Sequence, residues 1–308
     1  MRYLRFYTPM FQFSAFMGIF LGLYLIFMAG LMLFGGDISQ ITELKPETAT
    51  PALVQKFKII QFASAVCTFI VPAFLFNYLS DARPFQYAGF RKNTHPALLL
   101  FTVLILVASL PMVGLIGEWN SQFTWGMAQK EIEAIEERYN NSMAIILKMN
   151  GIGDLVVNLL LTAALPALAE EFFFRGTLQQ CLFRWWKSPV GAVLGSSIFF
   201  ALMHATFYKL IPILCMGIVL GTLFMVTRNI WCSILFHFLF NGMQIVVLYL
   251  AQHNKIKGFD PEKQEISFPV WAGITGLAAV VLLFAYLQKE KRRWIPASVF
   301  REQQTPAE

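Results

Sequence analysis

Charged residues are scarce in this sequence. Asp, Glu, Lys and Arg make up 14% of its 308 residues, whereas 57% are hydrophobic. A soluble domain carries charge on about a quarter of its residues, so a soluble protein of this composition would have to bury nearly every helix on all sides. Apolar runs of about 20 residues recur instead, which is the length that crosses the hydrocarbon layer as a helix. The composition therefore predicts an all-α, polytopic integral membrane bundle.

Cysteine and histidine are also rare, with four residues of each type. The cysteines are isolated and mostly lie in apolar runs, so the sequence has no CxxC pair and no disulfide framework. Packing is their simplest role. The first apolar run is long for a cleaved signal peptide and no A-x-A site follows it, so we interpret it as a retained span. The cysteines are Cys67, Cys181, Cys215 and Cys232.

The apolar runs predict about eight transmembrane helices, and they divide the chain into four parts. We expect N-terminal transmembrane helices over 1–126, an amphipathic connecting helix over 127–150, a core over 151–250, and a last transmembrane helix with a basic tail over 251–308. The sequence shows no internal repeat and no low-complexity tract. The expected spans lie near residues 12–34, 59–79, 97–117, 152–175, 190–206, 210–227, 230–250 and 268–288.

The net charge of +6 comes from basic residues in short loops beside apolar segments. Lys and Arg mark cytoplasmic loops in this way, so we expect no nucleic-acid partner. Placing both termini in the cytoplasm, in a bacterial inner membrane, puts all the basic clusters on one side. The clusters are Arg2 and Arg5; Arg83, Arg91 and Lys92; Arg184 and Lys187; and Lys289, Lys291, Arg292 and Arg293.

The segment 128–149 has apolar residues at spacings of three and four. Ile132, Ile135, Tyr139, Met143 and Ile146 follow this pattern, which is typical of an amphipathic helix with one apolar face. Such a helix either rests on the membrane surface or packs against the rest of the protein.

The few ionisable residues inside apolar runs gather in the second half of the chain. Glu170, Glu171 and Arg175 share one run within LAEEFFFRG (168–176), and His204 and His237 lie in two later runs. Charge at membrane depth costs several kcal/mol, so such residues are functional candidates by default.

Helical spacing assigns different partners to the two glutamates. Glu171 and Arg175 are four residues apart with the glutamate first, which favours an ion pair. Glu170 is rotated by about 100° around the helix and has no partner there. Burial and the adjacent negative charge favour the neutral form of a carboxyl group, which is how a site obtains a base that works near neutral pH. The alternative is that both glutamates only hold helices together.

Two more polar pairs lie on later helices. Phe200 and His204 are one turn apart, and counting from the turn RWWKSP (184–189) places His204 at about the height of Glu170. His237 and Asn241 are also one turn apart, so both can donate to a developing oxyanion. The alternatives are a hydrogen-bonded core histidine and a polar contact between helices.

These three pairs occur in an order that resembles the CPBP family of CAAX proteases and bacteriocin-processing enzymes, also called the Abi family. The matching motifs are E-E-x-x-x-R, F-x-x-x-H and H-x-x-x-N. The resemblance covers about residues 150–250 and implies an intramembrane endopeptidase, whose name-giving member removes the last three residues of prenylated CAAX proteins. It implies that Glu170 and His204 activate water, that His237 and Asn241 stabilise the oxyanion, and that Glu171, Arg175 and Phe200 support them.

Several alternatives stay open. Glu170, His204 and His237 would bind zinc if the enzyme were a metalloprotease, although we favour a metal-independent water and no cofactor. A transporter is disfavoured because the two halves differ sharply in polar content, while a non-catalytic scaffold or immunity protein could keep the same fold. The expected partners are membrane lipid and a hydrophobic or lipidated peptide, either prenylated or of the bacteriocin type.

Overall fold

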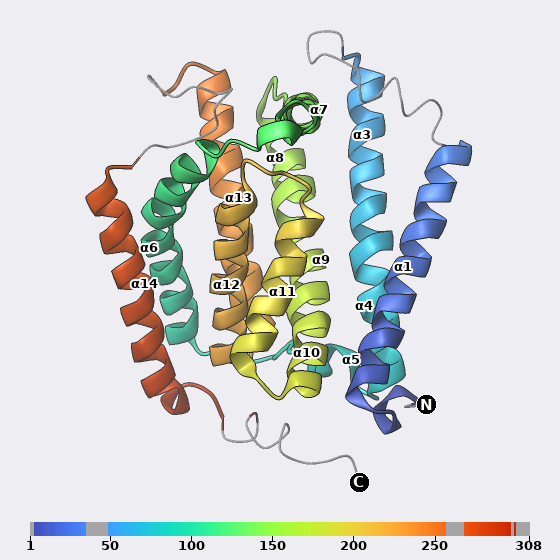
Figure 1. Ribbon diagram of the computed structural model, residues 1–308. Helices are drawn as coiled ribbons and strands as arrows, with labels where there is room; N and C mark the ends of the chain where they lie inside the picture. Colours follow the sequence, from blue (N-terminus) through green and yellow to red (C-terminus); the bar gives the residue numbers. More distant parts are fainter. Residues whose placement is uncertain (1–2, 35–48, 257–267, 297–298, 300–308) are drawn as a thin grey trace.

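The structure is a computed structural model that describes residues 3–34, 49–256, 268–296 and 299, and all its regular elements in these ranges are helices. Seven of these helices are long and apolar enough to cross a membrane, which confirms the predicted polytopic helical bundle (Figure 1). They are α1 (Pro9–Phe34), the continuous helix α3–α4 (Pro51–Ser80), α6 (Pro96–Ser121), the continuous helix α8–α10 (Ile152–Trp186), α12 (Leu210–Thr227), α13 (Ile230–Gln252) and α14 (Val270–Glu290).

The eighth expected span, near 190–206, is shorter than predicted. It corresponds to α11 (Pro189–Met203), which has 15 residues and a length of about 22 Å, less than the hydrocarbon core of about 30 Å. The helix ends here because Ala205 adopts a positive φ of 50°, a left-handed conformation that terminates helices. The chain therefore turns directly after His204.

Short elements connect these helices. The amphipathic helix α7 (Gln129–Ile146) follows a 3-10 turn at Gly126–Ala128. A π-helical segment at Ala65–Ile70 joins α3 (Pro51–Ser64) to α4 (Val71–Ser80), and α5 (Pro84–Tyr87) lies between α4 and α6. Further 3-10 turns are at Tyr3–Phe6 and Lys291–Arg293.

Proline and a capping side chain define where several helices begin. Thr50, His95 and Ser188 each accept a hydrogen bond from a backbone N–H of the first turn, and each is followed by the proline that starts α3, α6 or α11. Proline suits this position because its missing N–H would have no partner there. Asn229 caps α13 in the same way, without a proline.

The central helix α8–α10 is interrupted by two π-helical segments. Leu159–Ala164 lies between α8 (Ile152–Asn158) and α9 (Leu165–Phe173), and Phe174–Leu178 lies between α9 and α10 (Gln179–Trp186). Such π segments are frequent at functional sites. The pair Glu170–Glu171 lies on the short α-helical stretch between them.

Figure 1 shows α8–α10 in the middle of the bundle, with α1 and α3 on one side and α6 and α14 on the other. The start of α1, the end of α14 and the turn between α10 and α11 all lie at one end. The helix α7 crosses the opposite end. The predicted basic clusters in the described residues therefore share one end of the molecule.

The three phenylalanines after the glutamate pair join the central helix to the first half of the chain. The ring of Phe173 packs against Phe16, Phe20 and Phe69, with centroids 4.9, 5.0 and 5.3 Å away. Aromatic pairs at these distances stabilise beyond their buried area. In the stretch EEFFF, the two glutamates thus place charge in the site, and the phenylalanines pack the other faces of the helix against apolar neighbours.

The apolar face predicted for α7 packs partly against α3. Ile145 and Ile146 are buried in a cluster with Phe57, and Ile132 is also buried. Ile135, Tyr139 and Met143 are only partly buried. The same inner face carries Glu136, a buried carboxylate that the apolar pattern does not reveal.

Candidate active site

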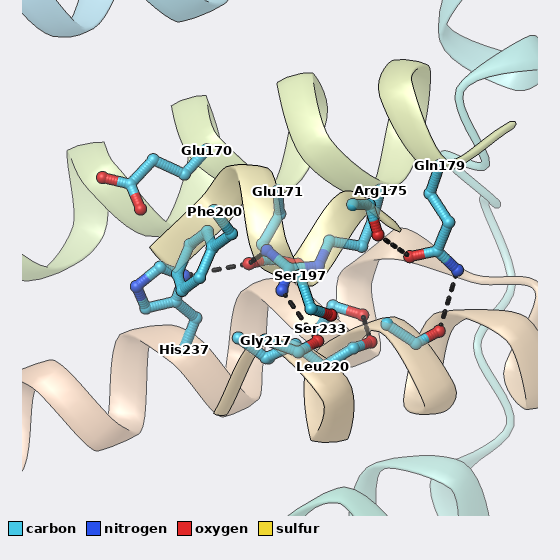
Figure 2. Close-up of polar contacts among 12 residues, drawn as sticks. Glu170, Glu171, Arg175, Gln179, Ser197, Phe200, Gly217, Leu220, Ser233 and His237 are labelled. Carbon is cyan, nitrogen blue, oxygen red and sulfur yellow. Dashed lines mark hydrogen bonds and ion pairs between the residues drawn. The ribbon is translucent and has the colours of Figure 1, made fainter. Parts of the chain in front are cut away.

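The buried pair Glu171 and Arg175 joins the central helix to α13 and α12 (Figure 2). Oε1 of Glu171 accepts a hydrogen bond from Nη1 of Arg175 at 2.8 Å, and Nδ1 of His237 lies 2.9 Å from the same oxygen. Nη2 of Arg175 donates to the carbonyl oxygen of Gly217 on α12 at 3.1 Å. Glu171 and Arg175 are fully buried, so each charge depends on the other for compensation.

The contact with Glu171 defines the orientation of His237. A nitrogen that faces a carboxylate carries the proton, so Nδ1 donates and the ring orientation is fixed. The other nitrogen, Nε2, is left on the far side of the ring. The sequence predicts the Glu171–Arg175 pair but gives no indication that His237 shares the same oxygen.

Glu170 points away from this cluster (Figure 2) and faces His204 instead. Its Oε2 lies 3.9 Å from Nε2 of His204, and the two side chains are 15% and 28% exposed. This separation is too long for a direct hydrogen bond. Within the described part of the chain, Oε2 of Glu170 has no hydrogen-bond partner.

A backbone contact determines which nitrogen of His204 carries the proton in the neutral ring. Nδ1 of His204 lies 2.7 Å from the carbonyl oxygen of Phe200. A carbonyl only accepts, so Nδ1 carries the proton. In the neutral ring, Nε2 therefore presents its lone pair towards Glu170.

Phe200 packs beside both histidines and Arg175. Its ring centroid is 4.6 Å from that of His204 and 6.0 Å from that of His237. The guanidinium carbon of Arg175 lies 4.6 Å from the same centroid, within the range of a cation–π interaction. The buried aromatic ring thus fixes the spacing of the two histidines.

Asn241 lies one turn beyond His237 on α13 and is partly buried. Among the described residues, its side chain makes no hydrogen bond, so its amide is available to a ligand. Asp154 is separate from the site, because its carboxylate accepts from the backbone N–H of Asn150 at the start of α8. The structure thus brings Glu170, Glu171, Arg175, Phe200, His204 and His237 together.

Sequence reasoning misses a layer of polar contacts behind the site. Gln179 is fully buried and donates to the carbonyl oxygen of Gly221 at 2.9 Å, parallel to the Arg175–Gly217 contact. A Cβ at Gly217 would lie 2.9 Å from Cβ of Ser197, so the glycine allows α12 to pack closely against α11. The signal was the G-x-x-x-G spacing of 217–221, which is typical of close helix packing in membranes.

The second π segment is tied to the first half of the chain. Asn77 on α4 donates to Oγ1 of Thr177 at 2.9 Å, and that hydroxyl donates to the carbonyl oxygen of Phe172 at 3.1 Å. Widened turns leave backbone groups to be satisfied by such side chains. An isolated asparagine in an apolar run was the only sequence signal.

The loop after His204 is held by Glu136 of α7. Oε1 of Glu136 accepts hydrogen bonds from the hydroxyl of Thr206 and from the backbone N–H groups of Phe207 and Tyr208. Burial raises the pKa of the nearby Tyr139, and the negative charges of Glu136 and Glu170 raise it further. The helix α7 therefore reaches both the His204 loop and the surroundings of Glu170.

The residues of the zinc alternative do not form a metal site. Among the described residues, no group of three or more His, Cys, Asp or Glu side chains is arranged to hold a metal ion. Nδ1 of His237 faces Glu171, and Glu170 and His204 face each other across 3.9 Å. Glu170, His204 and His237 are thus not gathered as the three ligands of one ion in the described residues, although a carboxylate at Nδ1 is also the usual partner of a histidine that binds a metal through Nε2.

The fold and the site together define a polytopic membrane protein with a buried glutamate–histidine centre. Residues 152–243 match the family model described as Rce1-like, type II CAAX prenyl endopeptidase, a range that includes all the candidate site residues. The match confirms the resemblance to the CAAX protease family, and at the family level it supports an intramembrane protease of the CAAX type. No match was found among curated proteins or among solved structures.

Proposed function

We propose that the protein is an intramembrane endopeptidase in which Glu170 and His204 activate a water molecule. The observation that carries the proposal is the gap of 3.9 Å between the Glu170 carboxylate and Nε2 of His204. Both facing atoms are acceptors, and water can donate one hydrogen to each. The pair is also more accessible than Glu171 and Arg175, whose side chains are at most 1% exposed.

The reaction begins with proton transfer from the water to Glu170. The oxygen then bonds to the carbonyl carbon of the scissile peptide, and the carbonyl oxygen becomes an oxyanion. When the C–N bond breaks, Glu170 returns the proton to the leaving amine. General acid–base catalysis of this kind contributes about 10²- to 10⁴-fold, and no covalent intermediate with the protein forms.

His237 and Asn241 are assigned to the oxyanion. Glu171 holds the proton of His237 on Nδ1 and stabilises the imidazolium, whose Nε2–H can then donate. The Asn241 amide, one turn away, supplies a second donor. Arg175 pairs with Glu171 at 2.8 Å, so it supports His237 through Glu171. An oxyanion donor of this type contributes about 10²- to 10³-fold.

The proposed substrate is a hydrophobic or lipidated peptide that reaches the site from the membrane. A prenylated CAAX-type peptide is supported by the matched family model, whose name includes prenyl endopeptidase, and peptides of the bacteriocin type remain a second class. We further propose that no cofactor is needed and that both termini face the cytoplasm of a bacterial inner membrane. The basic residues at one end of the bundle support this orientation.

The test compares the full-length protein with Glu170→Gln in detergent. Both are incubated with farnesylated CAAX peptides and with unmodified hydrophobic peptides, each carrying a fluorescent reporter. Glu131→Gln is the matched control, because Glu131 is an exposed glutamate on α7. We expect cleavage by the wild type and by the control, with a loss of at least about 100-fold in Glu170→Gln.

Thermal unfolding of each sample shows whether Glu170→Gln is folded. Cleavage that survives in folded Glu170→Gln would contradict the assignment of the base. No cleavage by any of the three proteins would favour the non-catalytic scaffold. Activity that disappears with a chelator and returns with zinc would overturn the metal-independent mechanism.

A further inference from the structure

A large cavity lies at the end of the bundle opposite α7, well separated from the glutamate–histidine site. Its volume is about 1040 Å³. Its walls are α5 and the loop before α6, the turn between α12 and α13, and residues 294–296 and 299 after α14. The proposed protease activity makes no use of this cavity.

The cavity concentrates positive charge. Arg83, Arg91, Lys92 and Arg228 line it, and none of the described residues that line it is acidic. The carboxylate of Asp81 faces the side chain of Arg5 and the backbone N–H of Arg83. Four cations from two segments therefore face one space.

The walls of the cavity are fastened to each other. The backbone N–H of Ile230 donates to the carbonyl oxygen of Gly89 at 3.1 Å, and Nδ2 of Asn229 donates to Oγ1 of Thr94 at 2.6 Å. Gly89 has a φ of 94°, and a Cβ there would lie 2.7 Å from the ring of Phe224. The loop before α6 is thus fitted closely to the turn between α12 and α13.

Arg228 lies on the turn between α12 and α13 and lines the cavity. It ends α12 in the left-handed conformation, with a φ of 53°, and its guanidinium carbon lies 5.7 Å from the ring centroid of Phe183. Partial burial lowers the pKa of Arg228 to about 10, so the side chain is still charged at neutral pH. A cation held in this way is suited to a phosphate group.

Exposed aromatic rings place the cavity at the boundary between lipid and water. Trp231 and Phe85 are 43% and 53% exposed, and Trp294 also lines the cavity. Tryptophan is enriched at this level of membrane proteins because its ring is apolar and its N–H is polar. Basic pockets between transmembrane helices at this level bind phosphate headgroups of lipids.

We propose that this cavity binds the headgroup of an anionic membrane phospholipid. Arg83, Lys92 and Arg228 contact the phosphate. The aromatic rim, formed by Phe85, Trp231 and Trp294, contacts the upper part of the acyl chains. Free phosphate shares the anionic chemistry, but it would fill little of this volume and would make no use of the rim.

The test is a lipid titration of the full-length protein in detergent, followed by native mass spectrometry. Phosphatidylglycerol and phosphatidylcholine with the same acyl chains are compared. The double variant Arg83→Gln/Lys92→Gln removes two exposed cations from the rim without touching the packed walls. Its matched control, Lys130→Gln/Lys148→Gln, removes two exposed lysines near the opposite end.

We expect phosphatidylglycerol to bind the wild type and the control alike, and phosphatidylcholine to bind much more weakly. Each rim cation removed should weaken phosphatidylglycerol binding about fivefold, so the double variant should lose about 25-fold. Arg228→Gln should also lose affinity, and Arg228→Lys should restore most of it. If Arg228→Gln does not fold, the double variant Arg83→Gln/Lys92→Gln alone tests the proposal.

Three results would overturn the proposal. Equal binding of the two lipids would show that the headgroup charge is not recognised. An equal loss in the control variant would show that the attraction depends only on net charge. Displacement of the lipid by millimolar inorganic phosphate would assign the site to free phosphate.

Discussion

Glu171 and His237 come from helices far apart in the sequence, yet Nδ1 of His237 lies 2.9 Å from Oε1 of Glu171. The same oxygen also accepts the hydrogen bond from Arg175 at 2.8 Å. One carboxylate therefore compensates an arginine and orients a histidine. The support of the site and the stability of the bundle are linked through this single group.

We expect Glu171→Gln to destabilise the protein strongly. Removing one partner of a buried ion pair leaves an uncompensated charge, which costs about 3–5 kcal/mol. The measurement is the thermal unfolding midpoint in detergent, with Glu131→Gln as the control. A further change of Arg175 to Met in the same chain should recover part of the loss, whereas additive losses would contradict the pairing.

Asn241→Leu should separate catalysis from stability. The amide of Asn241 has no hydrogen-bond partner among the described residues, so we expect little change in the unfolding midpoint. Loss of an oxyanion donor should lower kcat by about 10²- to 10³-fold. Gln244→Leu, on the same helix, is the control. A large drop in stability with an unchanged kcat would assign Asn241 to packing.

Glu136→Ala should affect the loop that follows His204. Its carboxylate accepts three hydrogen bonds there, and each bond to a charged group contributes about 1.5–3 kcal/mol. We expect a lower unfolding midpoint and a reduced kcat, with Glu137→Ala as the exposed neighbouring control. Hydrogen exchange of the amides of Phe207 and Tyr208 should accelerate. Unchanged exchange would contradict the contact.

Gly217→Ala should destabilise the contact between α11 and α12. The added Cβ would lie 2.9 Å from Cβ of Ser197, and overpacking of this kind costs about 1–3 kcal/mol. Gly18→Ala is the control, because a Cβ there meets no atom within 4 Å. Combining Gly217→Ala with Ser197→Gly should recover part of the stability. Equal effects of the two alanine substitutions would contradict close packing at Gly217.

Because of Tyr139, we expect the stability of the protein to fall at alkaline pH. The pKa of Tyr139 is raised in the folded protein, so the stability it contributes is complete below the ordinary tyrosine pKa of about 10. That contribution is lost as the pH rises through the folded pKa. Unfolding midpoints between about pH 8 and 11 should therefore fall less in Tyr139→Phe than in the wild type. Parallel curves would contradict the raised pKa.

Much of the fold is readable from the sequence because hydrophobic length is a direct signal in a membrane. Seven of the eight expected spans meet the length required of a spanning helix, and the pair Glu171–Arg175 follows from helical spacing. The short α11 was not predictable in this way, because its end depends on a left-handed Ala205. Alanine gives no local signal for that conformation.

The contacts between helices were the least predictable part. The position of His204 opposite Glu170 follows from counting residues from a turn, since the central helix ends at Trp186 and α11 begins at Pro189. The contact between His237 and Glu171 does not, because it depends on how α13 packs against α9. The role of Glu136 was hidden for the same reason, since its partners are mostly backbone groups of a distant loop.

The π-helical segments change the directions in which the side chains beyond them point, compared with an uninterrupted α-helix of the same residues. A π turn contains about one residue more than an α turn, which corresponds to a rotation of about 100° for everything beyond it. Deleting one residue from Phe174–Leu178 would thus turn Gln179 away from Gly221 while leaving the helix long enough to cross the membrane. The exact number of residues in this helix is therefore set by the directions in which its side chains must point, whereas the thickness of the bilayer would tolerate one residue fewer.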